Sequence, residues 1–247
     1  METIIREKGP EPKSPIIVEG LPGLGSIGGL AASFLIDRLK ARKIAELYSP
    51  YFPYQAIVDS RGIVRLPRGE FYCSTKNGRD LVIITGDCQP QTNYGQYEVA
   101  TKIIQYAVKC SASQIISIGG FVSPQKDGKQ VVGVATKSSL VSTLVSAGAC
   151  VEKAGIPIVG IAGLLVAIAR TLGLDAICLL AQTTGLGPDP SAAQKVLKVL
   201  SNALNLNLDL SSLDKQVAKM RRIEARVGEV EKKLASALKR DHTIYIG

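Results

Sequence analysis

Short apolar runs alternate with longer amphipathic stretches along most of the chain. Almost unbroken apolar runs are typical of strands that are covered on both faces of a sheet. These runs occupy residues 15–19, 43–47, 81–85, 114–119, 131–136, 156–160 and 175–181. Apolar residues at helical spacing predict helices over 27–40, 94–109 and 190–204, and another that ends at 172. This alternation predicts an α/β fold, a three-layer sandwich with a mostly parallel central sheet.

Three shorter β-favouring runs interrupt the alternation at 57–59, 63–66 and 71–75. Arg-Gly, Pro-Arg-Gly and Asn-Gly pairs or triplets punctuate them. Such turn residues between short apolar runs predict antiparallel hairpins.

The pattern divides the chain into four parts. Residues 1–14 form a polar N-terminal lead-in, and residues 15–210 form the α/β core domain. Residues 211–241 repeat apolar positions at spacings of three and four, which predicts a long amphipathic helix. Residues 242–247 form an apolar C-terminal tail, unlike the polar ends of most chains.

A glycine-rich turn follows the first predicted strand. Gly23, Gly25 and Gly28 match the spacing G-x-G-x-x-G, and Ser26 can cap the next helix. Glu46 lies where a ribose-binding acid of a dinucleotide site would be. Gly20-Leu-Pro, however, makes the turn longer than that fingerprint allows. We therefore expect the glycines to serve tight turning and close helix–sheet packing.

Four loops are expected at the carboxyl ends of the strands, where α/β folds form their pockets. They cover residues 21–28, 86–94, 119–123 and 182–189. Cys88 is a candidate nucleophile in one of them, beside Asp87, and Asp189 is a second candidate acid. A small residue at a strand end, and turn or capping roles, explain these residues equally well. Asp189 followed by Pro190 is a typical helix start.

Composition narrows the chemistry further. The single histidine is His242, and the five cysteines are widely spaced without C-x-x-C, so neither a metal site nor a disulfide scaffold is predicted. The charged N-terminus has no signal-peptide core, and the apolar stretch at 156–172 is short for a membrane span. We expect a cytoplasmic protein with no membrane association, no metal and no cofactor.

The net charge of +9 raises the question of an acidic partner. The segment 211–241 contributes nine Lys/Arg and five Asp/Glu. No basic run is interleaved with aromatic residues, so nucleic acid is the least favoured partner.

Four stretches together resemble the proteasome assembly chaperone family in its archaeal form. They are VEGLPGLGSIG at 18–28, GDCQPQ at 86–91 with Tyr97, IGGF at 118–121, and GIAGLL at 160–165 with TTG and DPSAA at 183–193. The resemblance implies a phosphorylase-like α/β sandwich without established enzymatic activity. It also implies a homo-oligomer that engages the 20S proteasome.

The tail is similar to the hydrophobic–Tyr–any motif that archaeal members of this family can carry. The resemblance implies that Ile244, Tyr245, Ile246 and Gly247 bind between the α-subunits of the proteasome, with a pocket lysine at the carboxylate. Tyr245 is third from the end rather than next to last. The extra residue displaces the carboxylate by about 3.3 Å.

The sequence therefore supports a non-enzymatic assembly chaperone or activator-like factor that binds the 20S proteasome through its tail. Its expected partners are the proteasome α-subunits, further copies of itself and, as a further candidate, a paralogous chaperone. The alternative is a nucleotide- or nucleoside-binding enzyme that uses the loop at 23–28. A basic nucleic-acid binder is the third hypothesis.

Overall fold

A computed structural model describes residues 2–122, 131–151, 155, 157–211, 213–214 and 217 of the chain. The chain forms two compact units, residues 1–208 and 209–247, and the sheet lies in the first unit. Its strands run in the spatial order β1 (Ile4–Glu7), β3 (Arg42–Tyr48), β6 (Gly69–Lys76), β7 (Arg79–Gly86), β2 (Ile16–Glu19), β8 (Gln114–Phe121), β10 (Ala176–Gln182) and β9 (Val131–Ala135). The helices are η1 (Leu24–Ser26, a 3-10 turn), α1 (Ile27–Arg38), α2 (Asn93–Lys109), α3 (Ser138–Ser146), α4 (Ile161–Thr171) and α5 (Pro190–Leu204).

The sheet is mixed rather than mostly parallel. Strands β7, β2, β8 and β10 form a parallel centre. On one side β6, β3 and β1 continue the sheet by antiparallel pairing, and on the other side β9 pairs antiparallel with β10. The α/β prediction and the antiparallel hairpin at Asn77-Gly78 are confirmed, whereas a mostly parallel sheet is wrong, because β1, β3, β6 and β9 pair antiparallel at the two flanks.

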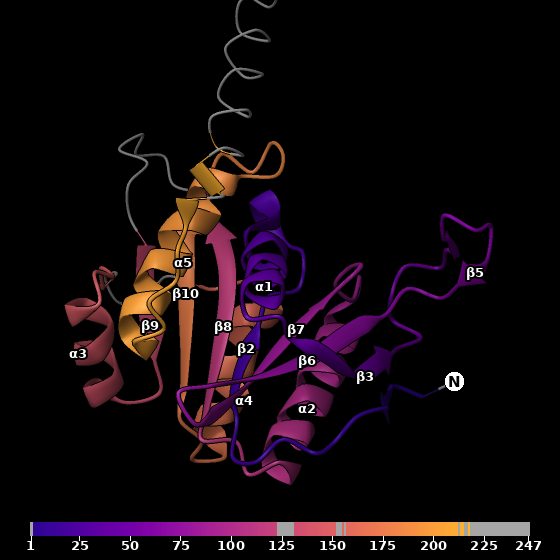
Figure 1. Ribbon diagram of the computed structural model, residues 1–247, viewed down its shortest axis with the longest axis horizontal. Helices are drawn as coiled ribbons and strands as arrows, with labels where there is room; N and C mark the ends of the chain where they lie inside the picture. Colours follow the sequence, from indigo (N-terminus) through magenta and orange to yellow (C-terminus); the bar gives the residue numbers. More distant parts are fainter. Residues whose placement is uncertain are drawn as a thin grey trace, which may run out of the picture. The chain divides into compact units, whose positions relative to one another are not determined.

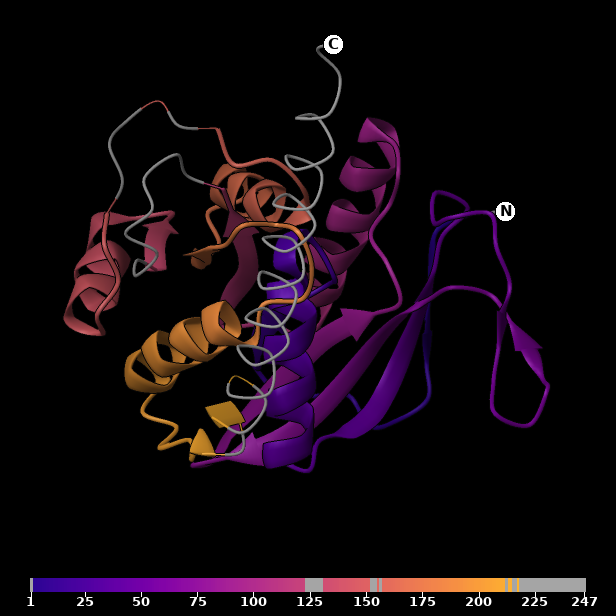
Figure 2. The ribbon, with the colours of Figure 1, turned by 90° about the horizontal axis from the view of Figure 1, so that it is seen from above.

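Helices cover both faces of the parallel centre (Figures 1 and 2). Helices α1 and α5 pack together, and α2 packs against α4. Ile17, Val82 and Ile115 belong to a buried cluster with residues of α2 and α4. The alternate residues Val18 and Ile116 are equally buried outside that cluster, because successive side chains of a strand point to opposite faces. This explains why the central strands read as unbroken apolar runs.

Several elements form where the local sequence predicts them. The β6–β7 hairpin turns at Asn77 and Gly78, whose φ values of 52° and 72° fit the primed turn that Asn-Gly favours. A small second sheet pairs β4 (Ile57–Val58) with β5 (Val64–Arg65). Asp189 caps α5 by accepting a hydrogen bond from the backbone N–H of Ala192 at 2.9 Å, with Pro190 as the first helical residue.

Three other expectations fail, and those for the C-terminal segments fall largely outside the described residues. The lead-in 1–14 contains β1, an edge strand paired with β3. Residues 157–160 form no strand; Gly160, with φ of 97°, instead precedes α4. Ser26 precedes α1 with a left-handed backbone (φ 48°), and its side chain makes no capping hydrogen bond. Of the predicted helix 211–241, only 211, 213, 214 and 217 are described, and these are helical. The tail 242–247 lies outside the described residues.

Candidate functional site

The four predicted loops meet at the carboxyl ends of the parallel strands. The backbone N–H of Asp189 donates to the carbonyl of Gly25 at 2.8 Å, and that of Thr183 donates to Phe121 at 2.9 Å. Gln89, from the loop after β7, lies against Gly23. Ser123, at the end of one loop, lies outside the described residues. The parallel centre of the sheet therefore brings the predicted loops together, as the topology of α/β sheets requires.

Protein atoms lie close against all three glycines of the turn. A Cβ at Gly28 would lie 2.7 Å from the carbonyl oxygen of Ile118, and one at Gly23 would lie 2.7 Å from Nε2 of Gln89. Gly25 has a φ of 62°, and a Cβ there would lie 2.9 Å from Oγ1 of Thr183. Residues of the loops after β7 and β10 thus pack directly against the turn, which is the close packing expected of its glycines.

The ribose-binding role considered for Glu46 is wrong. In a dinucleotide fold, the acidic residue ends the strand next to the one that precedes the glycine turn. Here β6 and β7 separate β3, which carries Glu46, from β2.

Glu46 instead lies in a network of charges on β3 and β6. Its carboxylate contacts Nζ of Lys8 at 2.6 Å and the guanidinium of Arg68 at 3.1 Å, and it accepts a hydrogen bond from the hydroxyl of Tyr48 at 3.0 Å. Burial alone would raise the pKa of this carboxyl, but the hydrogen bonds from Lys8 and Tyr48 and the charge of Arg68 lower it to about 2. Glu46 is therefore ionised and engaged within the protein.

Asp87 and Cys88 do not form a reactive pair. Both oxygens of Asp87 accept hydrogen bonds from the guanidinium of Arg65, at 2.6 and 2.8 Å, and one also accepts the backbone N–H of Arg68. Burial, followed by the negative charge of Asp87, raises the pKa of the Cys88 thiol to about 11. A thiol that stays protonated at neutral pH is a poor nucleophile. The Arg65–Asp87 pair serves to hold the β4–β5 hairpin against the end of β7.

A row of buried polar side chains runs across the parallel strands below these loops. Glu19, Ser117 and Cys178 are adjacent in register on β2, β8 and β10, and all three are completely buried. Oγ of Ser117 donates to the carbonyl of Ala162 at 2.7 Å. Burial raises the pKa of the Cys178 thiol to about 12. In the sequence, Glu19 is only a glutamate that ends an apolar run before the glycine turn, a pattern that predicts no particular role for it.

Glu19 is the most perturbed acid among the described residues. One carboxyl oxygen accepts the backbone N–H of Leu21 at 2.8 Å, while the other has no hydrogen-bond partner. Burial raises the pKa of Glu19 to about 8, although the hydrogen bond from Leu21 acts in the opposite direction. The carboxyl group is thus mainly protonated at pH 7, and it couples the end of β2 to the start of the glycine turn.

The rim of the loops exposes apolar side chains. Leu24 and Leu186 are 41% and 94% exposed, and Val122 is 59% exposed. Leu24 and Val122 both lie against Gly185, so these loops share one apolar surface. Exposed apolar side chains that cluster in this way are typical of contacts with other proteins.

The described part of the chain was expected to contain neither a metal site nor a membrane-spanning helix. Within it, no three His, Cys, Asp or Glu side chains are grouped so that they could hold a metal ion. None of the helices in that part is both long enough and apolar enough to cross a bilayer. His242 and residues 244–247 fall outside it.

Comparisons with known proteins agree with one another. The model of the PAC2 family matches residues 17–227. A crystal structure of Pyrococcus furiosus PbaB, described as an archaeal proteasome activator, superposes with a TM-score of 0.85 and 37% identity over 92% of this chain and 99% of that one. P. furiosus PbaA, described as an archaeal homologue of proteasome-assembly chaperone, gives 0.77 and 29% over 98% and 99%. An uncharacterised protein of Methanocaldococcus jannaschii is 30% identical over 91% of this chain and 87% of its own length.

Proposed function

Because this chain belongs to the PAC2 family, we propose that it is a non-enzymatic factor that acts on the 20S proteasome, as an assembly chaperone or an activator. The similarity to PbaB over nearly the whole of that chain is the observation that carries the proposal. The activity named for PbaB and PbaA is a property of those proteins. Its transfer to this chain rests on the shared fold together with the tail sequence.

The contact with the proteasome is assigned to residues 244–247. Ile244 and Tyr245 supply a large apolar anchor of the kind that dominates binding at small interfaces. If several copies of the chain assemble into a homo-oligomer, several tails can engage the α-ring at once. Multivalent attachment of this kind gives strong binding from individually weak contacts.

The body is assigned a scaffold role in the cytoplasm. Its candidate acids are engaged in the structure: Asp87 and Asp189, considered for acid–base chemistry, by Arg65 and Ala192, and Glu46, considered for ribose binding, by Lys8 and Arg68. Gly23, Gly25 and Gly28 allow the turn to approach neighbouring loops closely, which is a structural role. The apolar rim around Leu24 and Leu186 supplies a surface for a further copy of the chain or a paralogous chaperone.

Deleting residues 244–247 tests the proposal. The truncated chain is expected to keep the oligomeric state of the parent in size-exclusion chromatography and to lose co-elution with purified 20S proteasome. Thr243→Ala, which changes the neighbouring residue and keeps the anchor, is the matched control. Undiminished co-elution of the truncated chain would refute the role of the tail.

A further inference from the structure

Exposed basic side chains gather at the end of the sheet opposite to the loops described above. This end is formed by the β6–β7 turn, the segment that joins α1 to β3, and the residues before β2. The backbone N–H of Lys13 donates to Asp80 at 2.8 Å, and Oγ of Ser74 donates to the carbonyl of Leu39 at 2.8 Å. These hydrogen bonds join the three segments at one end of the domain. The exposed cations on them are Lys13, Lys40, Arg42, Lys76 and Arg79.

These five cations have no acidic partner among the residues that the structure describes. Asp80, which follows Arg79 in sequence, is already engaged, because its two oxygens accept hydrogen bonds from the backbone N–H of Lys13 and the hydroxyl of Thr75. Elsewhere on the domain, cations such as Lys109 and Lys137 are paired with Glu7 and Asp175. Lys102, Arg170 and Lys198 also have no ion-pair partner among the described residues, but they lie on three different helices, whereas the five cations lie on segments that meet at one end.

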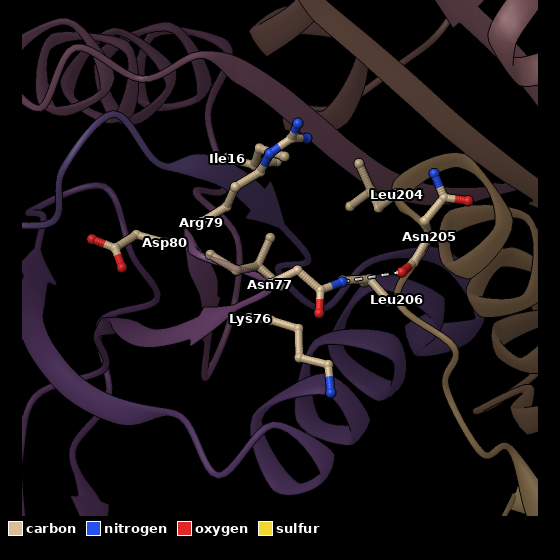
Figure 3. A pocket seen from close by; sticks show the side chains of 9 residues that line it. Ile16, Lys76, Asn77, Arg79, Asp80, Leu204, Asn205 and Leu206 are labelled. Atoms are coloured by element: carbon tan, nitrogen blue, oxygen red, sulfur yellow. Dashed lines mark hydrogen bonds between the residues drawn. The ribbon is translucent and has the colours of Figure 1, made fainter.

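A pocket opens within the basic end, between the β6–β7 turn and the end of α5 (Figure 3). Its volume is about 210 Å³. Its lining is part apolar, from Ile16, Leu81, Leu204 and Leu206, and part polar, from Lys76, Asn77, Arg79, Asp80 and Asn205. Figure 3 shows Arg79 beside Ile16, and Asn77 reaching across to Asn205, whose carbonyl it contacts at 3.4 Å.

We propose that this basic end, formed by Lys13, Lys40, Arg42, Lys76 and Arg79 and containing the pocket that Lys76 and Arg79 line, is a docking surface for an acidic polypeptide segment that inserts one apolar side chain. Positive charge without internal partners complements carboxylates on the partner and steers their encounter. The apolar lining gives the bound segment an anchor, which charge alone does not provide. The surface is separate from residues 244–247, so it adds a second contact to the proposed function rather than restating it.

A polypeptide fits this surface better than a nucleic acid. Proteins that bind single strands stack bases on aromatic side chains. None of the residues that line the pocket is aromatic. The pocket instead contains aliphatic side chains, from Ile16, Leu81, Leu204 and Leu206, that a leucine-like side chain can contact.

Fluorescence anisotropy with a labelled peptide tests the proposal. The probe is a 12-residue peptide of Glu, Asp and Ser with one central Leu, and a second peptide has Ser in place of that Leu. We expect the full chain to bind the first peptide at low salt and to bind the second several-fold more weakly. Arg79→Glu should weaken binding of the first peptide about tenfold. Lys102→Glu on α2, the same charge change away from the pocket, should leave it unchanged.

Each other outcome overturns the proposal. Equal losses for Arg79→Glu and Lys102→Glu would mean that only net charge matters. Equal affinity for the two peptides would mean that the pocket takes no apolar anchor. Tighter binding of a 12-nucleotide single strand than of the peptide, with the same loss for Arg79→Glu, would assign the surface to nucleic acid. The chain that lacks 244–247 should bind the peptide like the parent, which separates this test from that of the tail; thermal unfolding of each variant verifies folding.

Discussion

Glu19→Gln removes the buried ionisable group that lies beneath the glycine turn. In the parent, the pKa of Glu19 is raised from 4.5 to about 8 by burial. The folded state therefore holds the proton more tightly than the unfolded state, and stability falls as the pH rises between these two values. One proton corresponds to a slope of about 1.4 kcal/mol per pH unit. Between pH 5 and pH 8 the parent should lose about 4 kcal/mol through this group.

The glutamine side chain cannot ionise, so the variant should lack this slope. It keeps the acceptor for the backbone N–H of Leu21. Its amide leaves two buried N–H donors without a partner, one more than the O–H of the protonated carboxyl. The variant should therefore be slightly less stable than the parent at pH 5 and the more stable of the two at pH 8.

Urea denaturation followed by circular dichroism, at one-unit steps from pH 5 to pH 8, measures this difference. Other groups titrate in both proteins, and the difference between the two curves removes them. Glu11→Gln, which replaces an exposed glutamate, is the matched control and should follow the parent. Parallel pH dependence of parent and Glu19→Gln would refute the assignment of a neutral, buried Glu19.

Three further predictions concern the loops and the charge network. Gly28→Ala places a methyl group 2.7 Å from the carbonyl oxygen of Ile118 and should lower the free energy of unfolding by about 1–3 kcal/mol, measured by thermal unfolding. Gly187→Ala, whose added Cβ has no atom within 4 Å, is the control and should be tolerated. Equal effects of the two substitutions would contradict the close packing at Gly28. Asp189→Ala should lower the free energy of unfolding by about 1–2 kcal/mol, and Asp189→Asn should lower it much less, because only asparagine keeps an acceptor for the backbone N–H of Ala192. An equal loss for the two variants would argue against capping. The lowered pKa of Glu46, about 2, adds stability above pH 4.5 that disappears as the pH falls toward 2. Glu46→Gln should thus cost about 3 kcal/mol at pH 7 and little at pH 2 in urea titrations, and a pH-independent cost would refute the ionic role.

The local parts of the fold could be predicted from sequence because their causes are local. Asn77-Gly78 specifies a hairpin turn through its backbone preferences, and Asp189-Pro190 specifies a helix start through capping. The unbroken apolar run of β2 indicates burial on both faces, which is what α1 and α2 with their partners provide.

The order and direction of the strands could not be read in this way. Residues 157–160 have a strand-like composition, but the position beside β8 is taken by β10, and β9 covers the other edge of β10. Glu46 matched a ribose acid in its sequence separation, whereas the hairpin of β6 and β7 places it away from the glycine turn. Both errors concern which segments become neighbours, and that depends on the whole chain rather than on any window of it.

The buried acid was missed for a related reason. Glu19 is one polar residue at the end of an apolar strand, and nothing near it in sequence shows that Ser117 lies beside it in the sheet, with Cys178 on the far side of Ser117. The predicted loop cluster succeeded because parallel strands place their carboxyl ends together regardless of their order.

The affinity of the chain for immobilised 20S proteasome tests the central claim most directly. Three forms of the 247-residue chain should be compared: the parent, one without Gly247, and one without residues 244–247. Removing Gly247 places Tyr245 next to last, and we predict that this form binds at least as tightly as the parent. The form without 244–247 should not bind. Equal dissociation constants for all three forms would contradict a proteasome contact made by the tail.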